Sequence, residues 1–261
     1  MDVFIWSGFQ LPRRLAGSGI IILVLLLALV LEMKRVVQPE LLDELPPDDP
    51  RALHSRRDLR RINAWMGNRA VLVRALQTGW NGQAPKQITE LGAGDGNFLL
   101  GVARKTSSRW PKVNVTLIDL QNNVTPQTLA SFASLNWRAE AVVADVFEWS
   151  QASAPAEIVT ANLVLHHFDD VRLAGLFRAI AARSRLFIAI EPRRGPWPLF
   201  CARLLWAIGC NSVTRHDAVV SMRAGFFGAE LSALWPEGGG WQLTEHRTGL
   251  FSHLFVARKI Q

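Results

Sequence analysis

The sequence predicts an α/β fold in which a mostly parallel sheet carries helices on both faces. Five apolar runs of strand length alternate with helical patterns, at residues 87–91, 112–119, 139–146, 157–162 and 185–192. The first run leads directly into a loop with three glycines. Two alternating runs near the carboxyl terminus flank Arg247-Thr248-Gly249, which predicts an antiparallel hairpin. A parallel core with a terminal hairpin is therefore the expected architecture.

The composition is that of a folded protein with a sizeable core. The chain has 261 residues, enough for one α/β domain and an appendage. Hydrophobic residues make up 49% of it, which excludes global disorder. The two cysteines, Cys201 and Cys210, cannot form a disulfide framework, and no C-x-x-C pair indicates zinc. This cysteine content favours a reducing compartment such as the cytoplasm.

The chain is basic, with a formal net charge of +7. Such a charge suits nucleic acid or an anionic membrane, and an arginine-rich solvated surface also explains it. The sequence contains no N-P-P-[YFW] motif for a target base and no separate RNA-binding module. We therefore expect a small-molecule substrate and no nucleic acid.

The amino terminus contains an uncharged apolar run at residues 15–31. A membrane-spanning helix needs about 20 apolar residues, with about 17 as the lower limit. No A-x-A cleavage site follows the run. Residues 1–35 are therefore expected to hold a hydrophobic membrane-anchor helix, with the remaining chain at the cytosolic face. Met33 also resembles a start of translation, which would make the preceding residues an extension of a cytoplasmic protein.

Two further segments precede the sheet. Residues 36–50 are acidic and proline-rich, which predicts a linker. Residues 51–84 show helical periodicity, with apolar residues on one face and arginines on the other. These helices are expected to form a lid over a substrate, although the basic face is also explained by solvent exposure. Residues 85–261 would then form the main domain.

The glycine loop indicates which ligand the sheet binds. Its sequence from Glu90 to Gly96 has the pattern E-x-G-x-G-x-G, and Asn97 stands where a dinucleotide fingerprint needs its third glycine. The pattern resembles the first motif of class I S-adenosylmethionine-dependent methyltransferases, which have a Rossmann-like sheet. The resemblance implies that the loop lies under the methionine half of S-adenosyl-L-methionine. The cofactor-binding residues that it implies here are Glu90, Gly92, Ala93, Gly94 and Gly96.

Polar residues at the ends of the next strands extend this resemblance. Asp119 ends the second strand, where a carboxylate can accept hydrogen bonds from both ribose hydroxyls. The resemblance places Asp145, after the third strand, near the adenine amino group, with the amide of Val146 beside it. Asn162 ends the fourth strand against the cofactor. A helix cap or turn is the structural alternative for Asp119.

Histidines beyond the fourth strand are candidates for a general base. His166 and His167 follow Asn162 in a segment that the family often carries as L-H-H-F, on the side where substrate enters. A histidine there could take a proton from a hydroxyl, because its reference pKa lies near neutrality. Packing against the next helix is the structural alternative. No third ligand is apparent for zinc, so no metal is expected.

The segment after the fifth strand supplies the remaining candidates. Glu191 ends that strand, where it could orient substrate or pair with Arg193. In this family, insertions before the terminal hairpin commonly build the acceptor pocket, which makes Arg215 and Asp217 candidate pocket residues. His216 is the second candidate for a general base. Capping and salt bridges explain these residues equally well.

The combined pattern predicts an enzyme. We expect S-adenosylmethionine-dependent methylation, on oxygen or carbon, of a small and hydrophobic or phenolic acceptor. The segments 61–63, 66–68 and 214–218 also resemble bacterial methyltransferases found beside type III polyketide synthases. That resemblance implies a phenolic lipid or polyketide-derived ring. A non-catalytic cofactor-binding protein of the same fold and a nicotinamide-dependent oxidoreductase are the alternatives.

Overall fold

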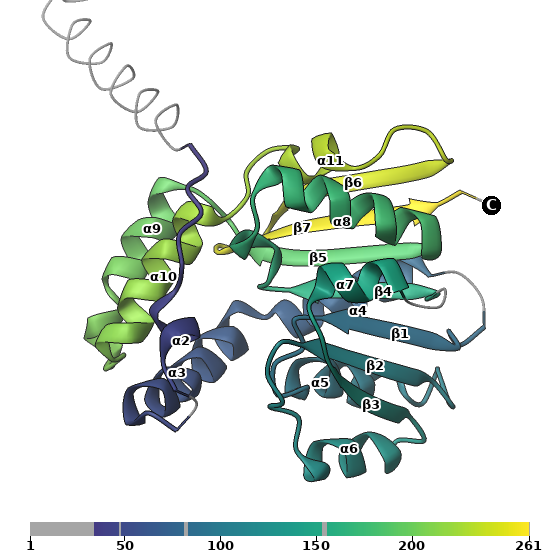
Figure 1. Cartoon of the computed structure of the whole chain (residues 1–261), viewed down its shortest axis with the longest axis horizontal. Helices are drawn as coiled ribbons and strands as arrows, with labels where there is room; N and C mark the ends of the chain where they lie inside the picture. Colours follow the sequence, from purple (N-terminus) through teal and green to yellow (C-terminus); the bar gives the residue numbers. More distant parts are fainter. Residues whose placement is uncertain (1–33, 47, 81–82, 153–155, 261) are drawn as a thin grey trace, which may run out of the picture. The chain divides into compact units, whose positions relative to one another are not determined.

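The computed structural model describes residues 34–46, 48–80, 83–152 and 156–260. Its centre is a seven-stranded sheet in the order β3-β2-β1-β4-β5-β7-β6 (Figure 1). The strands are β1 Gln87–Leu91, β2 Asn114–Asp119, β3 Arg138–Val143, β4 Ile158–Asn162, β5 Leu186–Pro192, β6 Trp241–Thr248 and β7 Ser252–Lys259. β1 to β5 pair in parallel, whereas β7 pairs antiparallel with both β5 and β6. The predicted Rossmann-like sheet and its terminal hairpin are confirmed.

Helices surround this sheet. The α-helices are α2 Leu41–Glu44, α3 Pro50–Met66, α4 Asn68–Gly79, α5 Asn97–Thr106, α6 Pro126–Ala133, α7 Val146–Ala152, α8 Asp170–Arg183, α9 Pro196–Arg203, α10 Ser212–Ala224 and α11 Glu230–Leu234. Two short 3₁₀-helices, η1 Leu165–His167 and η2 Leu205–Ile208, lie between them. The loops between the parallel strands and their crossover helices place polar residues at the carboxyl ends of the strands.

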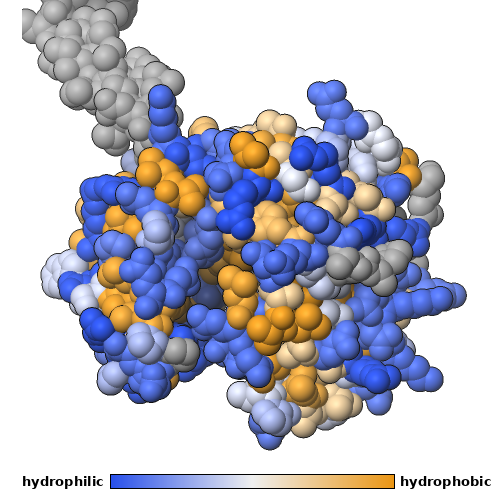
Figure 2. All heavy atoms as spheres, in the orientation of Figure 1, coloured by the Kyte–Doolittle hydropathy of each residue, from blue (hydrophilic) through white to orange (hydrophobic). Residues whose placement is uncertain are grey.

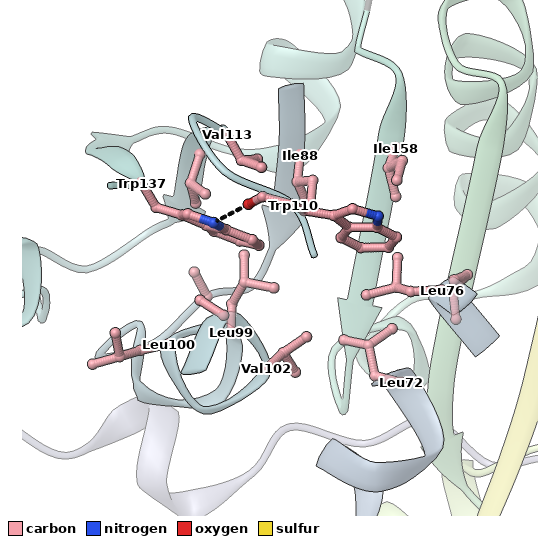
Figure 3. Packing of buried hydrophobic residues seen from close by; sticks show 14 of the residues in the cluster. Leu72, Leu76, Ile88, Leu99, Leu100, Val102, Trp110, Val113, Trp137 and Ile158 are labelled. Atoms are coloured by element: carbon pink, nitrogen blue, oxygen red, sulfur yellow. Dashed lines mark hydrogen bonds between the residues drawn. The ribbon is translucent and has the colours of Figure 1, made fainter. Parts of the chain in front are cut away.

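Two hydrophobic clusters cover the two faces of the sheet. Consecutive strand residues point to opposite faces, so Ile158 packs in one cluster and Val159 in the other. The first cluster joins α4 and α5 to the sheet, and Trp137 Nε1 there donates a hydrogen bond to the Trp110 carbonyl at 2.8 Å (Figure 3). The second cluster joins α8 and α11 to the opposite face. A sheet fixed on both sides provides a rigid base for residues at its edge.

A second layer of helices lies beyond the carboxyl end of β5. α9 and α10 follow β5, and α2 and α3 pack on α10; Figure 1 shows these four helices gathered on one side of the sheet. The segment predicted as a linker, residues 36–50, thus contains α2 and the first residue of α3. Asp217 on α10 fixes α2, because its carboxylate accepts hydrogen bonds from the amides of Leu41 and Leu42.

The helical segment after β5 is broken. α9 ends at Arg203, and the 3₁₀-helix η2 follows it from Leu205 to Ile208. Gly209, with φ of 79°, ends that turn in the left-handed region. Asn211 caps α10, since its side chain accepts from the Thr214 amide, and Thr214 itself is buried.

None of the described helices is both long and apolar enough to cross a membrane. The predicted membrane-anchor helix at residues 15–31, within the 1–35 segment, lies outside the described residues. Membrane anchoring by that segment therefore stays a prediction.

Candidate active site

The glycine loop joins β1 to α5 and needs glycine for two different reasons. Gly92, Gly94 and Gly96 all have positive φ, at 64°, 56° and 72°. A Cβ at Gly92 would lie 2.5 Å from Val164 Cγ2, and one at Gly96 would lie 2.9 Å from Leu117 Cδ1. A Cβ at Gly94 would meet nothing within 4 Å. Gly92 and Gly96 are thus required by packing, whereas Gly94 borders open space where a ligand can approach.

Asp119, at the end of β2, holds this loop. Its Oδ2 accepts a hydrogen bond from the Gly94 amide at 2.8 Å, and its Oδ1 accepts from the Gln121 amide at 2.9 Å. Asp145 follows β3 and accepts from the Phe147 amide at 2.7 Å, while Val146 is buried at the start of α7. Together with Glu90 on β1, the two aspartates lie at the ends of three adjacent parallel strands. The structure therefore brings the three predicted carboxylates to one edge.

A cavity of about 260 Å³ opens beside the loop. Its walls come from the strand ends and from the helical layer. The lining residues are Glu40, Leu59, Ile62, Asn63, Met66, Glu90, Gly92, Ala93, Gly94, Asp95, Phe98, Asn162, Leu163, His166, His167, Pro192, Ala218, Ser221 and Met222. About half have apolar side chains, and the polar ones come from both walls, which suits a small-molecule site.

Glu90 is the most unusual polar group of this cavity. The side chain is buried, and its Oε2 has no hydrogen-bond partner among the described residues. Burial, followed by the charges of Asp95 and Asp119, raises the pKa of Glu90 well above its ordinary value. An unpartnered buried carboxyl is costly, so it indicates a ligand that supplies a hydrogen-bond donor or a positive charge.

His166 is also buried, but both of its ring nitrogens have carboxylate partners. Nδ1 lies 2.8 Å from Glu191 Oε2, and Nε2 lies 3.4 Å from Glu40 Oε1. Burial lowers the pKa of His166, but the hydrogen bonds and charges of Glu191 and Glu40 outweigh it and raise the pKa to about 9. At neutral pH, His166 is therefore a cation with no lone pair to accept a proton.

His167 is in the opposite state. Burial and the neighbouring positive charge of His166 lower the pKa of His167 to about 4. Its Nδ1 lies 3.6 Å from Asp43 Oδ2, and the pKa of that carboxyl is raised to about 6 by burial and by the charges of Glu40 and Asp217. His167 lines the cavity as a neutral imidazole. The two adjacent histidines thus carry different charges, because His166 pairs with two carboxylates, whereas His167 is buried beside the cation of His166.

Glu191 is fully buried and organises the turn that carries both histidines. Its Oε1 accepts from the amides of Val164 and Leu165, at 3.1 and 2.9 Å, and its Oε2 accepts from the His166 amide at 3.3 Å. Glu191 does not line the cavity. It therefore positions the 3₁₀ turn η1 and its histidines.

The end of β4 is fixed by a second polar chain. Asn162 Oδ1 accepts from Asn68 Nδ2 at 3.1 Å, and Asn68 Oδ1 accepts from Ser252 Oγ at 2.6 Å. The next residue, Leu163, has φ of 57°, which is uncommon for a residue with a side chain. Both Asn162 and Leu163 line the cavity.

Several predicted site residues lie elsewhere. His216 and Arg215 are exposed on α10, and the His216 Nδ1 lies 2.9 Å from Asp217 Oδ1. Asp217 is buried and holds α2, as described above. Gly96, Asp119, Asp145 and Val146 do not line the cavity either. The structure thus separates His216 from the histidine pair.

Sequence reasoning found only part of the helical wall. Leu59, Ile62 and Met66 belong to the apolar face that helical periodicity predicts for residues 51–84, and all three line the cavity. Glu40 and Ser221 had no such signal, because only the fold brings residue 40 to α10, where Ser221 donates a hydrogen bond to Glu40.

The structure places the Glu40 carboxylate beside His166 and His167, a contact that the sequence did not reveal. Ligand atoms of Glu40, His166 and His167 all lie within 4.8 Å of one another. Carboxylates already satisfy both ring nitrogens of His166. We therefore interpret the cluster as an ion-paired proton network.

Comparison with known proteins identifies the domain. Residues 88–185 match the family model of a methyltransferase domain. These residues contain the glycine loop, both aspartates at the strand ends and the histidine turn, on a sheet with the strand order described above. Residues 88–185 are thus identified as a methyltransferase domain. This match supports S-adenosylmethionine as the cofactor and methyl transfer as the reaction.

Solved structures of low sequence identity share the fold. The plantazolicin methyltransferase BamL, solved with a triazolic desmethylPZN analogue and SAH, aligns at a TM-score of 0.58 and 13% identity, over 82% of this chain and 93% of that chain. Magnesium protoporphyrin IX methyltransferase of Synechocystis PCC 6803, with bound SAM, aligns at a TM-score of 0.51 and 11% identity, over 97% of this chain and 100% of that chain. The pyocyanin biosynthetic protein PhzM aligns at 0.52 and 14%, over 82% and 60%. No curated protein sequence matches the chain.

Proposed function

We propose that this methyltransferase O-methylates a small apolar acceptor whose hydroxyl is acidic, as in a phenol, and that His167 accepts the proton. The observation that carries the proposal is His167 itself, a neutral imidazole in a cavity about half of whose lining residues are apolar. Leu59, Ile62 and Met66 of α3 supply apolar surface opposite the glycine loop. Such a cavity suits the flat, apolar body of an aromatic ring.

The base strength of His167 favours a phenol over an alcohol. The pKa of His167 is about 4. Proton transfer to it from a phenol of pKa about 10 is therefore uphill by about 8 kcal/mol, since each pKa unit corresponds to about 1.4 kcal/mol. Proton transfer from an aliphatic alcohol, whose pKa lies far above that of a phenol, would be still more uphill. A ring carbon beside the hydroxyl of the same phenol is the alternative methyl acceptor.

We assign the cofactor to the glycine-loop wall of the cavity. The partnerless carboxyl of Glu90 suits the ammonium group of S-adenosylmethionine, and the open face of Gly94 allows close approach of the methionine half. Asp119 would accept from the ribose hydroxyls, and Asp145 with the Val146 amide would contact adenine. The bound cofactor supplies an activated methyl group, so the protein's main contribution is to orient the acceptor oxygen.

We propose that the helical layer acts as the lid. Residues 51–84 contain α3 and α4, and α3 supplies four of the residues that line the cavity. Glu191 and Asp217 act as positioning residues, since both carboxylates accept backbone hydrogen bonds. His216 and Arg215, which do not line the cavity, would not contact the acceptor.

A matched pair of acceptors tests the proposal. The full chain is incubated with methyl-labelled S-adenosylmethionine and either an alkylphenol or an aliphatic alcohol of the same length, and products are identified by mass spectrometry. We expect the O-methyl ether of the phenol only. His167→Ala should slow its formation at least about a hundredfold, whereas His216→Ala is the control with unchanged turnover. Preferential methylation of the alcohol, or equal loss in both variants, would contradict the proposal.

A further inference from the structure

The outer surface of the helical layer carries an unusual set of exposed apolar side chains. On α9, Trp197 and Phe200 are 55% and 50% exposed, and their rings stack with centroids 5.8 Å apart. Leu204 continues the same stripe at the end of the helix and is also exposed. The opposite stripe, Pro198 and Ala202, is buried. The solvent-facing side of α9 is therefore at least as apolar as its buried side, the reverse of an ordinary surface helix.

The apolar surface continues into η2. Trp206 is 60% exposed and Ile208 is also exposed, so aromatic and aliphatic side chains protrude over one short segment, residues 197–208. Figure 2 shows hydrophobic surface interspersed with hydrophilic surface on the side where α9 and α10 lie. Exposed apolar surface of this kind marks an interaction site.

The charges around this segment select its partner. Between residues 192 and 216 the sequence has four arginines and no aspartate or glutamate. Arg203 is exposed on α9 itself, next to Leu204. Tryptophan, phenylalanine and leucine beside arginine are the residues of helices that lie in the headgroup region of a bilayer. Arg194 is buried and pairs with Glu230, so the exposed Arg203 carries the positive charge that suits anionic lipid.

The amino-terminal sequence supports the same partner. Arg35 is fixed to the end of α10, since its Nε donates to the Ala224 carbonyl at 2.9 Å, and the Val36 amide donates to the Arg223 carbonyl at 3.2 Å. α10 packs against α9. The uncharged run 15–31 ends only four residues before Arg35 in the sequence.

We propose that α9 and η2 form a membrane-docking surface that inserts its aromatic side chains into the headgroup region of an anionic bilayer. This surface belongs to the helical layer that also lines the cavity. α10, which packs against α9, contributes Ala218, Ser221 and Met222 to the cavity lining. Docking holds this layer at the lipid surface. It requires no membrane-spanning helix and does not depend on the chemistry of the acceptor.

Hydrogen–deuterium exchange of the full chain with vesicles tests the proposal, because it reports on residues 197–208 whatever the amino terminus binds. With phosphatidylcholine vesicles containing phosphatidylglycerol, we expect exchange of the amides in this segment to slow by at least about tenfold, as burial of apolar side chains predicts. Phosphatidylcholine alone should give a smaller effect.

A variant set identifies the side chains. Replacement of the three aromatics together, Trp197→Ser, Phe200→Ser and Trp206→Ser, should remove the protection and leave the melting temperature unchanged, since all three are exposed. Trp65→Ser is the matched control, because Trp65 on α3 is 67% exposed and lies outside this segment. Unchanged exchange with anionic vesicles would overturn the proposal. Persistent protection in the triple variant, or protection that depends on protein concentration without lipid, would also overturn it.

Discussion

The two walls of the cavity treat their buried charges differently. On the glycine-loop wall, Glu90 is buried with an unpartnered oxygen and a raised pKa. On the helical wall, Glu40 pairs with His166, whose other ring nitrogen pairs with Glu191 of β5, outside the cavity lining. The carboxyl of Glu90 therefore has no positive partner in the protein, whereas the carboxylate of Glu40 already has one in His166. This difference is why we propose that the cationic ligand binds at the glycine-loop wall and that the neutral His167 faces the acceptor.

The largest expected effect is on the helical wall. His167→Ala should lower the rate of methyl transfer about 10²–10⁴-fold, the usual contribution of a general base. The affinity of this variant for S-adenosylhomocysteine should change less than about twofold, since His167 lies on the wall opposite the glycine loop. Single-turnover kinetics and calorimetry measure the two quantities. Equal losses in rate and cofactor affinity would show that the walls are not separate.

Glu90→Gln should mainly lower the affinity for S-adenosylhomocysteine. A charged hydrogen bond contributes about 1.5–3 kcal/mol, so affinity for S-adenosylhomocysteine should fall about 10- to 150-fold. Without ligand the variant should melt higher at pH 7–8. A carboxyl whose folded pKa is raised stabilises the fold only at low pH and loses that contribution as pH rises. Scanning calorimetry of both proteins checks this, and a lower melting temperature for the variant would contradict it.

Two alanine substitutions compare packing with ligand access within one loop. Gly92→Ala should destabilise the fold by about 2–5 kcal/mol, because both a positive φ and a 2.5 Å contact with Val164 oppose it. Gly94→Ala meets no atom within 4 Å, so it should cost only about 1–2 kcal/mol for its φ while weakening cofactor binding. Urea unfolding and ligand titration separate these outcomes. Equal destabilisation would contradict the distinction.

The smallest effect concerns pH. A histidine with a raised pKa stabilises the fold fully below its unfolded value of about 6.5 and loses that contribution as pH rises through the folded value. For His166 this loss occurs as pH approaches and passes about 9, and it amounts to about 2–3 kcal/mol. Unfolding free energies at pH 6.5 and 9.5 should differ less in His166→Asn or Glu40→Gln. An unchanged difference in both variants would contradict the ion-paired network.

The same comparison explains what could be predicted from the sequence. The glycine-loop wall is local: strand, glycines and helix are contiguous, and Asp119 and Asp145 end the next strands in order. Parallel strands bring such ends to one edge, so order along the chain was enough to predict their convergence.

The helical wall could not be predicted in the same way. Glu40 meets His166 and Ser221 from more than a hundred residues away, and no local pattern indicates that contact. The difference between His166 and His167 depends on these contacts, so the sequence could only name both. Asp217 was expected in the pocket, but a buried carboxylate near free backbone amides caps them instead.

Proton release during cofactor binding tests the account most directly. Titration of S-adenosylhomocysteine into the full chain at pH 7.5, in buffers of different ionisation enthalpy, measures it. Because the ligand's ammonium should restore the charge of Glu90, we expect binding with the release of up to about one proton, and less release in Glu90→Gln. Absence of binding, or the same proton release in both proteins, would contradict the assignment of the cationic ligand to Glu90.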